Sequence, residues 1–403
     1  MNIGNLPSQW KVTRLGDVAR IVSGGTPDRS KLEYWNGNIP WVKTGEINYG
    51  VITETEEKIT QEGLDNSSAR IMPVGTTLMA MYGQGITRGR VAILGIDSAI
   101  NQACAAISIN NDISTDFLFY FLTFSYDKIR SLGHGANQKN LNSAFIRSIE
   151  VILPPLPEQR AIAHTLRTIQ KAKEARQREL ELERERKAAL MQYLFTHGTR
   201  NEPQNWKVVR LGEISKISSG GTPSRSKPEY WNGDIPWVKT GEITYGIIQD
   251  TEEKITQEGL KNSSAKLVKA GTLLMAMYGQ GVTRGRVAIL GIDATINQAC
   301  AAISTLGHIS TDFLFYFLSY NYEAIRNLGH GANQKNLNAD FIKSITIKLP
   351  NYDEQCEIAD ILRLCDKKIT AIGQESTALD ELFRAMLEEM MTGHLSALPL
   401  VAL

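Results

Sequence analysis

Three glycines within residues 81–90 hold side chains that suit a polyanionic ligand. The segment reads MYGQGITRGR and places Tyr82, Gln84, Arg88 and Arg90 around those glycines. Glycine lets a backbone approach a partner closely, while arginine suits a phosphate or a guanine edge and glutamine suits an adenine edge. The pattern therefore predicts a nucleic-acid contact. A tight hairpin whose arginines are merely solvated is the alternative that the sequence leaves open.

Two further polar segments are candidates. HGANQKNLN at 134–142 offers a dense set of donors of the kind that contacts phosphates: His134, Asn137, Gln138 and Lys139. The alternative there is a turn that ends a helix and satisfies its own backbone. GGTPDRSKLEYW at 24–35 projects Arg29 and Lys31 from a Gly-Pro turn, whereas its two aromatic residues are expected in the core.

No catalytic constellation accompanies these segments. The sequence has no GxxxxGK[ST] phosphate loop, no GxSxG elbow and no HExxH motif. Its one Pro-Pro pair, Pro154-Pro155, lies at a strand-to-helix junction and not in a loop that could hold a flipped base. The cysteines form neither a CxxC pair nor a zinc-like cluster with histidine: Cys104, Cys300, Cys356 and Cys365. The chain alone is therefore predicted to be non-catalytic and to hold no cofactor or metal.

The same segments occur twice. Shifting the sequence by 196 positions aligns MYGQG at 81–85 with MYGQG at 277–281, and about 108 of the 150 positions from Trp10 to Gln159 are identical in the second copy, without a gap. The second set of candidate contacts is Arg225, Lys227, Tyr278, Gln280, Arg284, Arg286, His330, Asn333, Gln334 and Lys335. Two copies of one binding surface suit a ligand of approximate twofold symmetry, and duplex DNA is the commonest such ligand.

Length and composition agree with two globular domains. A chain of 403 residues exceeds what one hydrophobic core usually supports. Lys plus Arg total 44 against 43 Asp plus Glu, so a nucleic-acid site must be a local basic patch. The N-terminus lacks a basic region leading into an apolar stretch, and the most apolar window, 117–122, is far too short to span a bilayer. These features predict a cytoplasmic chain without a membrane partner.

Each copy divides again into a globule and a helix. Residues 10–153 combine short β-prone runs with one helical stretch from Ser114 to Leu132, which predicts an α+β fold. Residues 158–197 contain no Gly or Pro, as expected of one long helix. The expected boundaries are 1–157 and 198–353 for the two globular domains, 158–197 and 354–394 for the two helices, and 395–403 for a tail.

The two predicted helices have complementary charge. Residues 158–197 carry nine Lys or Arg against six Glu, whereas 354–394 carry four against nine Asp or Glu. Apolar residues at spacings of three and four form a nearly continuous stripe along the second helix, while the same positions of the first are charged in the middle. The helices are therefore expected to pair with each other. Two separate solvated helices, each packed on its own domain, are the alternative.

These residues resemble the specificity subunit of type I restriction-modification systems, the HsdS family. The resemblance covers essentially the whole chain. It rests on the tryptophan and Leu-Gly opening at 10–16, YWNGNIPWV at 34–42, NQACAAI at 101–107 and PLPEQRAIAHTL at 155–166, each followed by its repeat. The second copy departs from the family in reading LPNYDEQ at 349–355, at the junction with the helix.

The resemblance implies an α+β architecture of two near-identical target-recognition domains, separated by an antiparallel pair of long coiled-coil-like helices with pseudo-twofold symmetry. It implies that each domain reads one half of a bipartite site in double-stranded DNA. The helices would set the spacer and dock two methyltransferase subunits, joined in the full enzyme by two restriction-translocase subunits. S-adenosylmethionine, ATP and Mg²⁺ would belong to those partners. A recognition subunit for another assembly, a type II-like or orphan methyltransferase or nuclease, is the alternative.

Near-identity of the two domains predicts that both read the same short sequence, which gives a near-symmetric inverted repeat. The glycine-rich loops of the two copies differ only at Ile86 and Val282. Other differences lie at Asp28/Ser224, Asn48/Thr244, Asp65/Lys261 and Met72-Pro73/Val268-Lys269. If any of these side chains contacts bases, the symmetry of the site is imperfect.

Overall fold

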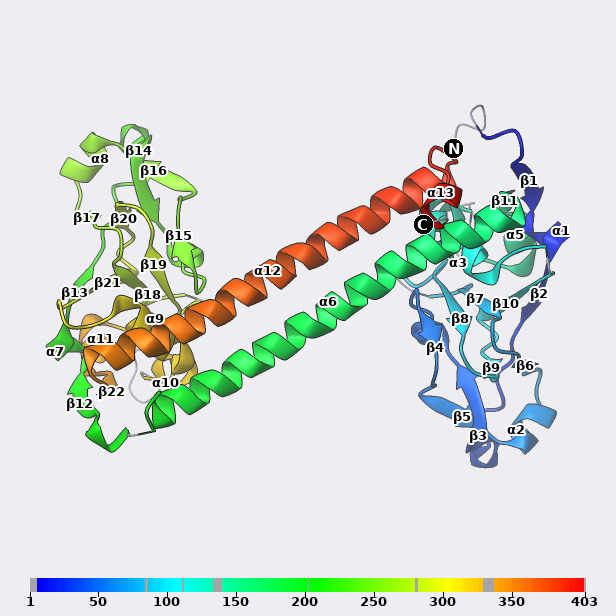
Figure 1. Ribbon diagram of the computed structural model, residues 1–403, viewed down its shortest axis with the longest axis horizontal. Helices are drawn as coiled ribbons and strands as arrows, with labels where there is room; N and C mark the ends of the chain where they lie inside the picture. Colours follow the sequence, from blue (N-terminus) through cyan, green and yellow to red (C-terminus); the bar gives the residue numbers. More distant parts are fainter. Residues whose placement is uncertain are drawn as a thin grey trace. The chain divides into compact units, whose positions relative to one another are not determined.

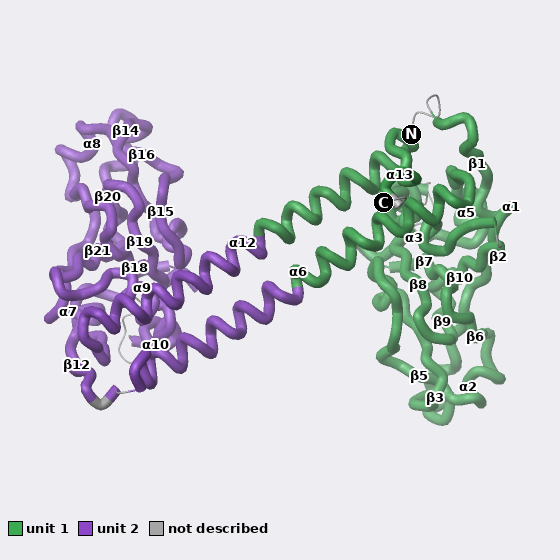
Figure 2. The backbone as a smooth tube through the Cα atoms, viewed as in Figure 1, with its two compact units in different colours: residues 1–177, 374–403 green, residues 178–373 purple. Residues whose placement is uncertain are grey.

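The computed structural model describes residues 6–83, 86–110, 112–132, 140–201, 203–279, 282–328 and 337–401 (Figure 1). The chain forms two compact units (Figure 2). Unit 1 comprises residues 1–177 and 374–403, and unit 2 comprises residues 178–373. Each unit therefore contains one globular domain and a part of both long helices.

Unit 1 contains three sheets. The first and last strands of its globular domain, β1 (Lys11–Arg14) and β11 (Glu150–Leu153), form an antiparallel pair. A five-stranded sheet has the order β2-β10-β7-β8-β4, and a four-stranded sheet has the order β5-β3-β9-β6. The strands of these two sheets are β2 Ala19–Ser23, β3 Trp35–Val42, β4 Val51–Ile52, β5 Glu57–Ile59, β6 Ile71–Met72, β7 Thr77–Ala80, β8 Val91–Leu94, β9 Ser98–Ile100 and β10 Cys104–Ile109. Only the β3/β9 and β4/β8 pairs are parallel among the described strands of this unit.

Short helices connect and cover these sheets: α1 Leu15–Val18, α2 Gln61–Asp65, α3 Thr115–Phe124, α4 Tyr126–Ser131 and α5 Ser143–Arg147. The expectation of one helix from 114 to 132 was wrong, because the chain leaves the helical conformation at Ser125 (φ −82°, ψ 6°). Serine competes for backbone hydrogen bonds and so favours helix ends. The break turns α4 away from α3 and lets α4 contact the loop that follows β7.

Unit 2 repeats this order of elements. Its strands are β12 Lys207–Arg210, β13 Ser215–Ser219, β14 Trp231–Val238, β15 Ile247–Ile248, β16 Glu253–Ile255, β17 Leu267–Val268, β18 Leu273–Ala276, β19 Val287–Leu290, β20 Ala294–Ile296, β21 Cys300–Thr305 and β22 Thr346–Leu349. Its short helices are α7 Leu211–Ile214, α8 Gln257–Lys261, α9 Thr311–Tyr320, α10 Tyr322–Arg326 and α11 Ala339–Ser344. The strand order of each sheet matches that of unit 1, so the two copies of the sequence form one fold, as predicted.

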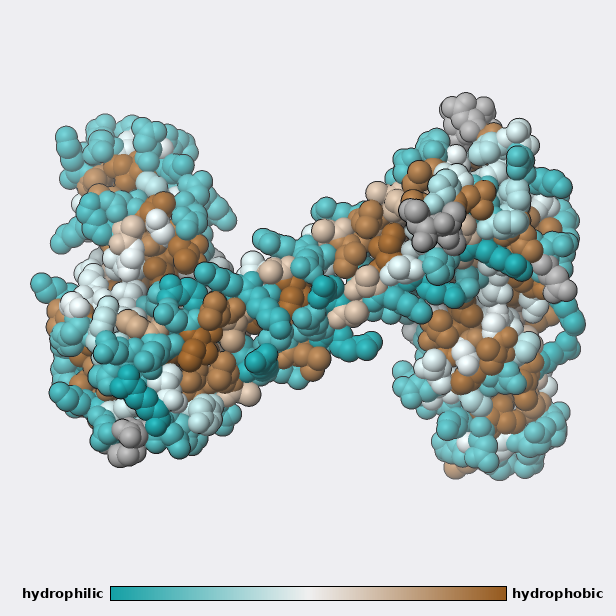
Figure 3. All heavy atoms as spheres, in the orientation of Figure 1, coloured by the Kyte–Doolittle hydropathy of each residue, from teal (hydrophilic) through white to brown (hydrophobic). Residues whose placement is uncertain are grey.

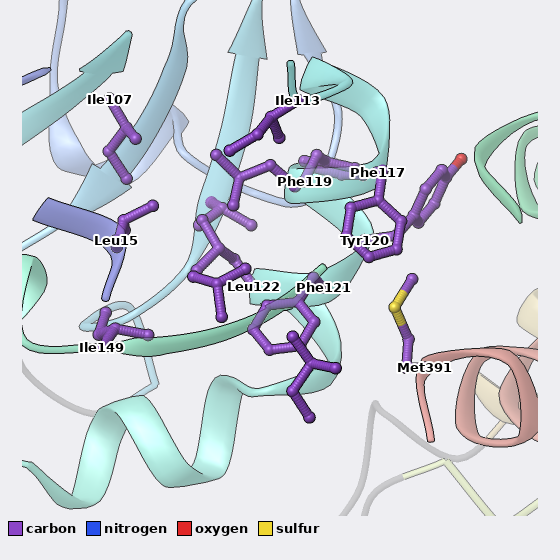
Figure 4. Packing of buried hydrophobic residues seen from close by; sticks show 14 of the residues in the cluster. Leu15, Ile107, Ile113, Phe117, Phe119, Tyr120, Phe121, Leu122, Ile149 and Met391 are labelled. Atoms are coloured by element: carbon purple, nitrogen blue, oxygen red, sulfur yellow. The ribbon is translucent and has the colours of Figure 1, made fainter. Parts of the chain in front are cut away.

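The core of unit 1 lies between the five-stranded sheet and the helices. Figure 4 shows side chains of α3, among them Phe117 and Phe121, gathered with Leu15, Ile149 and Met391. Phe117 and Leu15 are fully buried. Burying an aromatic side chain of this size is worth about 1.5–3 kcal/mol, so α3 is a main source of the domain's stability.

A buried tryptophan and a buried Glu-Gln pair join the domain to its first long helix. Trp10 Nε1 donates to Glu158 Oε2 at 3.0 Å, and Gln159 Oε1 accepts from the backbone N–H of Ser114, the N-cap of α3, at 2.9 Å. These bonds satisfy polar groups that burial would otherwise penalise. They explain the tryptophan opening and the Pro-x-x-Glu-Gln motif of the sequence. Unit 2 has the same bonds, with Trp206, Glu354, Gln355 and Ser310.

The helix expected over 158–197 is α6, Leu156–His197, and the helix expected over 354–394 is α12, Tyr352–Met391, followed by the short α13, Leu398–Val401. Within each unit the two long helices pair antiparallel. In unit 1, Lys173 pairs with Asp380 and Arg176 with Glu375. In unit 2, Lys187 pairs with Asp366 and Glu183 with Lys368. The predicted pairing of the two helices is confirmed, and the charged middle of α6 supplies its ion pairs.

Polar residues cover most of the visible face of each unit, with apolar patches between them (Figure 3). In the described part of the chain, no helix is long and apolar enough to cross a membrane. Burial raises the pKa of the Cys104 and Cys300 thiols to about 12. These two cysteines are therefore protonated packing residues at neutral pH.

Candidate nucleic-acid interface

The loop at 81–90 connects the two strands of a hairpin, β7 and β8. The backbone N–H of Ala80 donates to the Arg90 carbonyl at 2.9 Å, and the N–H of Gly89 donates back to the Ala80 carbonyl at 2.9 Å. Gly89 has φ +87° and its counterpart Gly285 has φ +86°, a conformation that side chains other than glycine rarely adopt. The hairpin predicted as the alternative is therefore present, and the arginines beside it are not simply solvated.

Arg88 fastens this loop to α4. Its Nη2 donates to the backbone carbonyl of Arg130 at 3.0 Å. The hydroxyl of Tyr126 donates to the carbonyl of Ile86, and Arg130 Nη1 lies 3.3 Å from the same hydroxyl. The corresponding bonds in unit 2 join Arg284 to Arg326 and Tyr322 to Val282. The described end of the loop, from Ile86 and Val282 onward, is therefore hydrogen-bonded to α4 and α10 in the two domains.

Arg90 lies on the other side of the loop. Its Nη1 donates to Asn48 Oδ1 at 2.8 Å, and its guanidinium carbon lies 5.7 Å from the centroid of the Tyr49 ring. The Tyr49 and Tyr126 rings meet edge to face with centroids 6.0 Å apart. Burial raises the pKa of Tyr49 to about 12, so this phenol stays protonated. Among the described residues, no carboxylate forms an ion pair with Arg90 or with its counterpart Arg286.

We call the five residues that meet here the arginine–tyrosine cluster: Tyr49, Arg88, Arg90, Tyr126 and Arg130 in unit 1, and Tyr245, Arg284, Arg286, Tyr322 and Arg326 in unit 2. The three arginines are half-buried. Tyr82 and Tyr278, in the same loops, are about 40% exposed. Three preorganised guanidinium groups beside exposed aromatic rings suit an anionic ligand with flat bases.

The described end of the segment HGANQKNLN lies beside the glycine-rich loop. The N–H of Leu141, in this segment, donates to the carbonyl of Met81, the first residue of MYGQGITRGR, at 3.0 Å. The structure thus brings the flanks of two predicted contact segments together. Several predicted contacts lie outside the described residues: Gln84, His134, Asn137, Gln138, Lys139, Gln280, His330, Asn333, Gln334 and Lys335.

Arg29 and Lys31 lie in a different part of the domain, against the four-stranded sheet. Arg29 donates to Glu57 at 2.6 Å and its guanidinium carbon lies 3.8 Å from the centroid of the Trp35 ring. Lys31 Nζ donates to the Tyr34 hydroxyl at 2.9 Å, and this bond raises the pKa of Lys31. In unit 2, Arg225 pairs with Glu253 and Lys227 donates to the Tyr230 hydroxyl, which are the equivalent partners. As DNA contacts these four residues stay a prediction.

Sequence reasoning missed three residues that build the interface, Tyr49, Tyr126 and Arg130, and named Asn48 only as a difference between the two copies. A signal for two of them was present in the repeat. Residues 125–131 read SYDKIRS in the first copy and NYEAIRN in the second, so four of seven positions differ while Tyr126, Ile129 and Arg130 do not. Ile129 is buried and needs no further explanation. The clue was that Tyr126 and Arg130, which are only partly buried, are unchanged between the two copies.

No group of three or more His, Cys, Asp or Glu side chains in the described ranges is arranged to hold a metal ion. Among the described residues, the cluster and its neighbour Asn48 present guanidinium, phenol and amide groups. Such groups bind and orient a ligand through hydrogen bonds and charge.

A globular domain that occurs twice, each time with an arginine–tyrosine cluster and a long helix, defines a duplicated binding protein. The family model described as "Type I restriction modification DNA specificity domain" matches residues 7–184 and 203–381. The chain belongs to this family and carries two of its domains, as the sequence resemblance implied.

Relatives and solved structures agree with this assignment. The chain is 23% identical over 414 residues to the type I restriction enzyme MjaIX specificity subunit of Methanocaldococcus jannaschii, covering 98% of this chain and 95% of that protein. Its fold is similar to the S subunit of a type I restriction-modification system from M. genitalium, with a TM-score of 0.63, 16% identity and 97% coverage of each chain. It is also similar to the HsdS subunit from Thermoanaerobacter tengcongensis, with a TM-score of 0.52, 19% identity and coverage of 98% and 99%.

Proposed function

We propose that this chain is the DNA-recognition subunit of a type I restriction-modification enzyme, and that each domain binds one half of a bipartite double-stranded site through its arginine–tyrosine cluster. The observation that carries the proposal is the repetition of the cluster with the same hydrogen bonds, Arg88 to Arg130 at 3.0 Å and Arg284 to Arg326 at 2.9 Å. Two equal binding surfaces suit two inverted half-sites.

The long helices support a role as the spacer between half-sites. α6 has 42 residues, which corresponds to about 63 Å at 1.5 Å per residue. One turn of DNA spans about 34 Å, so a helix of this length is long enough to separate two readers by a turn. An unread spacer of fixed length then becomes part of the recognised sequence.

The chain would act without catalysis of its own. Two methyltransferase subunits and, in the complete enzyme, two restriction subunits would dock on it and bring S-adenosylmethionine, ATP and Mg²⁺. The recognised adenine would be flipped out of the duplex by the methyltransferase partner. Because the domains are nearly identical, the two half-sites would form a near-symmetric inverted repeat.

A genome-wide map of methylated bases tests this proposal. The map is made in cells that express the chain with a type I methyltransferase subunit encoded beside it. A split motif with one modified adenine in each half supports the proposal. Absence of methylation, together with failure of the purified chain to bind that methyltransferase, would point to another effector. A purified chain that methylates or cuts DNA unaided would contradict a non-catalytic role.

Single substitutions test the cluster itself. Arg130→Ala and Arg326→Ala are each expected to weaken binding of the full complex to its site by tenfold or more, because a lost charge-assisted contact costs about 1.5–3 kcal/mol. Lys128→Ala is the matched control, because Lys128 lies on the same helix and residue 324 of the second copy is already alanine. Equal losses in Arg130→Ala and Lys128→Ala would contradict a specific role for the cluster.

A further inference from the structure

One polar contact of the arginine–tyrosine cluster is not shared by the two domains. Arg90 donates to the amide oxygen of Asn48 at 2.8 Å, but the position equivalent to Asn48 is Thr244. The threonine hydroxyl sits on the β-carbon, one atom closer to the backbone than the asparagine amide oxygen, and it offers no carbonyl acceptor. The second-domain arginine therefore lacks the amide anchor. Its guanidinium instead hydrogen-bonds with Tyr245, a phenol whose pKa is raised by burial and slightly lowered by this bond.

The backbone around this position is the same in both domains. Tyr49 has φ +56° and Tyr245 has φ +62°, a conformation in which residues other than glycine are uncommon. The N–H of Tyr49 donates to the Val91 carbonyl at 2.9 Å, and that of Tyr245 donates to the Val287 carbonyl at 3.0 Å. The two copies thus differ in one side chain on one fixed backbone.

The distance between the arginine and its aromatic neighbour is nearly the same in both domains. The guanidinium carbons of Arg90 and Arg286 lie 5.7 and 5.8 Å from the centroids of the Tyr49 and Tyr245 rings. A ring contact limits the distance of a guanidinium but leaves its in-plane rotation free. A hydrogen bond to a fixed amide oxygen restricts that rotation. Bidentate recognition of a guanine edge needs a fixed rotation, because two N–H groups must meet two acceptors together.

From these contacts we infer that Asn48 and Thr244 make the two domains unequal readers. Asn48 is a positioning residue that holds Arg90 in one orientation, so domain 1 discriminates strictly at the base pair opposite this arginine. Arg286 has only the Tyr245 hydroxyl in place of the fixed amide oxygen, so its guanidinium is held less firmly and domain 2 accepts more base pairs at the equivalent place. The inference rests on the proposed function and deepens it. The recognised site is then an inverted repeat with one strict and one tolerant half.

A library of DNA duplexes tests this inference. Each duplex carries the bipartite site with one base pair of one half-site varied, and methylation of each duplex by the complex of the full chain with its methyltransferase subunit is measured. Asn48→Thr should reduce discrimination in one half-site by about three- to tenfold, the value of one intramolecular hydrogen bond of about 0.5–1.5 kcal/mol. Thr244→Asn should raise discrimination in the other half-site by a similar factor. Both substitutions install a residue that the other domain already accommodates.

Ile86→Val is the matched control, because it makes the first loop identical to the second at an exposed side chain that is 60% accessible. It should leave discrimination in both half-sites unchanged. If Asn48→Thr weakens methylation of every duplex equally, Arg90 contacts only phosphate and the inference is wrong. Unchanged discrimination in both reciprocal variants also overturns it. A wild-type complex without any sequence preference would overturn the proposed function, and this inference with it.

Discussion

The two globular domains repeat most of each other's contacts, whereas the helices that accompany them do not. The difference is clearest where α3 of unit 1 and α9 of unit 2 contact the long helices. In unit 1 the hydroxyl of Tyr120 donates to the neutral Gln170 at 3.0 Å. In unit 2 the hydroxyl of the equivalent Tyr316 donates to the carboxylate of Asp366 at 2.7 Å. The same place in the fold thus has a neutral partner in one unit and a charged partner in the other.

A second side chain packs on each of these tyrosines, and it too is uncharged in unit 1 and charged in unit 2. The ring of Phe383 packs on Tyr120 with centroids 6.1 Å apart, whereas Lys187 lies 5.2 Å from the centroid of Tyr316 and forms an ion pair with Asp366. Binding surfaces that meet similar half-sites gain from being similar. Helices that must pair with each other gain from being different, because a helix that matched itself would also pair with a second copy.

The buried N-terminal parts of the two long helices should contribute equally to stability, because they pack on equivalent positions of the two domains. The remainder of the helices should not. Leu166 and Leu362 are both fully buried against their own domain. Leu166→Ala and Leu362→Ala should each lower the free energy of unfolding of their unit by about 2–5 kcal/mol, the usual cost of such a cavity. Urea unfolding followed by circular dichroism measures both. Losses that differ by more than about 2 kcal/mol would show that the two junctions are not equivalent.

Substitutions at the hydrogen-bond acceptors of Tyr120 and Tyr316 should destabilise the two units unequally. Asp366→Ala removes the acceptor of Tyr316 and the partner of Lys187, whose side chain is only 21% exposed, so we expect a loss of about 1–3 kcal/mol. Gln170→Ala removes one neutral hydrogen bond and should cost less than about 1 kcal/mol.

The double variant Lys187→Phe with Asp366→Gln sharpens this contrast. It installs the neutral junction of unit 1 in unit 2, and replacement of a paired charge by packed neutral groups is often nearly neutral for stability. The double variant should therefore be more stable than Asp366→Ala in the same urea titration. Equal destabilisation of Gln170→Ala and Asp366→Ala would remove the distinction between the junctions.

Substitution of Arg29 and Arg225 tests whether arginines that pair with a carboxylate of their own domain also contribute to DNA binding. Each stacks on a tryptophan and pairs with a glutamate, and each side chain is 54% exposed. Arg29→Ala and Arg225→Ala should each cost about 1 kcal/mol of stability, since exposed cation–π contacts and ion pairs are weak. DNA binding by the full complex should fall less than in Arg88→Ala, because Glu57 and Glu253 already neutralise these guanidinium groups. A larger fall in DNA affinity than for Arg88→Ala would show that Arg29 and Arg225 belong to the DNA interface.

The repeat made much of the fold predictable from the sequence. The offset of 196 residues, the stretch without Gly or Pro at 158–197 with its counterpart at 354–394, and the opposite charge of these two stretches predicted the two-domain architecture and the helix pairing. The break at Ser125 was not predicted, because one serine in an apolar run shifts the helical periodicity too little to be seen. The division of both helices between the two units also depends on tertiary contacts that no local pattern records.

The site was predictable only in part. Arg88 and Arg90 stood out through their glycines, but Arg29 has the same residue type and an equally suggestive turn. The difference between them is Glu57, which lies 28 positions away and reaches Arg29 only once β5 has formed. Tyr49 and Arg130 joined the cluster through packing of α4 on the hairpin, which spacing along the chain does not reveal.

The smallest expected effect concerns the ion pairs between the helices in unit 1. The hydrogen bond from Lys173 lowers the pKa of Asp380, and Arg384 acts in the same direction. A pKa lower in the folded than in the unfolded state means that the stabilisation is complete above the unfolded value of about 3.9 and is lost as the pH falls through the folded value. Asp380→Asn should thus be less stable than the wild type at pH 6, by under about 1 kcal/mol for a partly exposed pair. The gap should shrink when the urea titration is repeated at pH 3. Glu381→Gln, at the adjacent exposed position, controls for the general loss of a carboxylate. A gap for Asp380→Asn that stays constant between the two pH values would mean that this pair adds nothing to the preference of the two helices for each other.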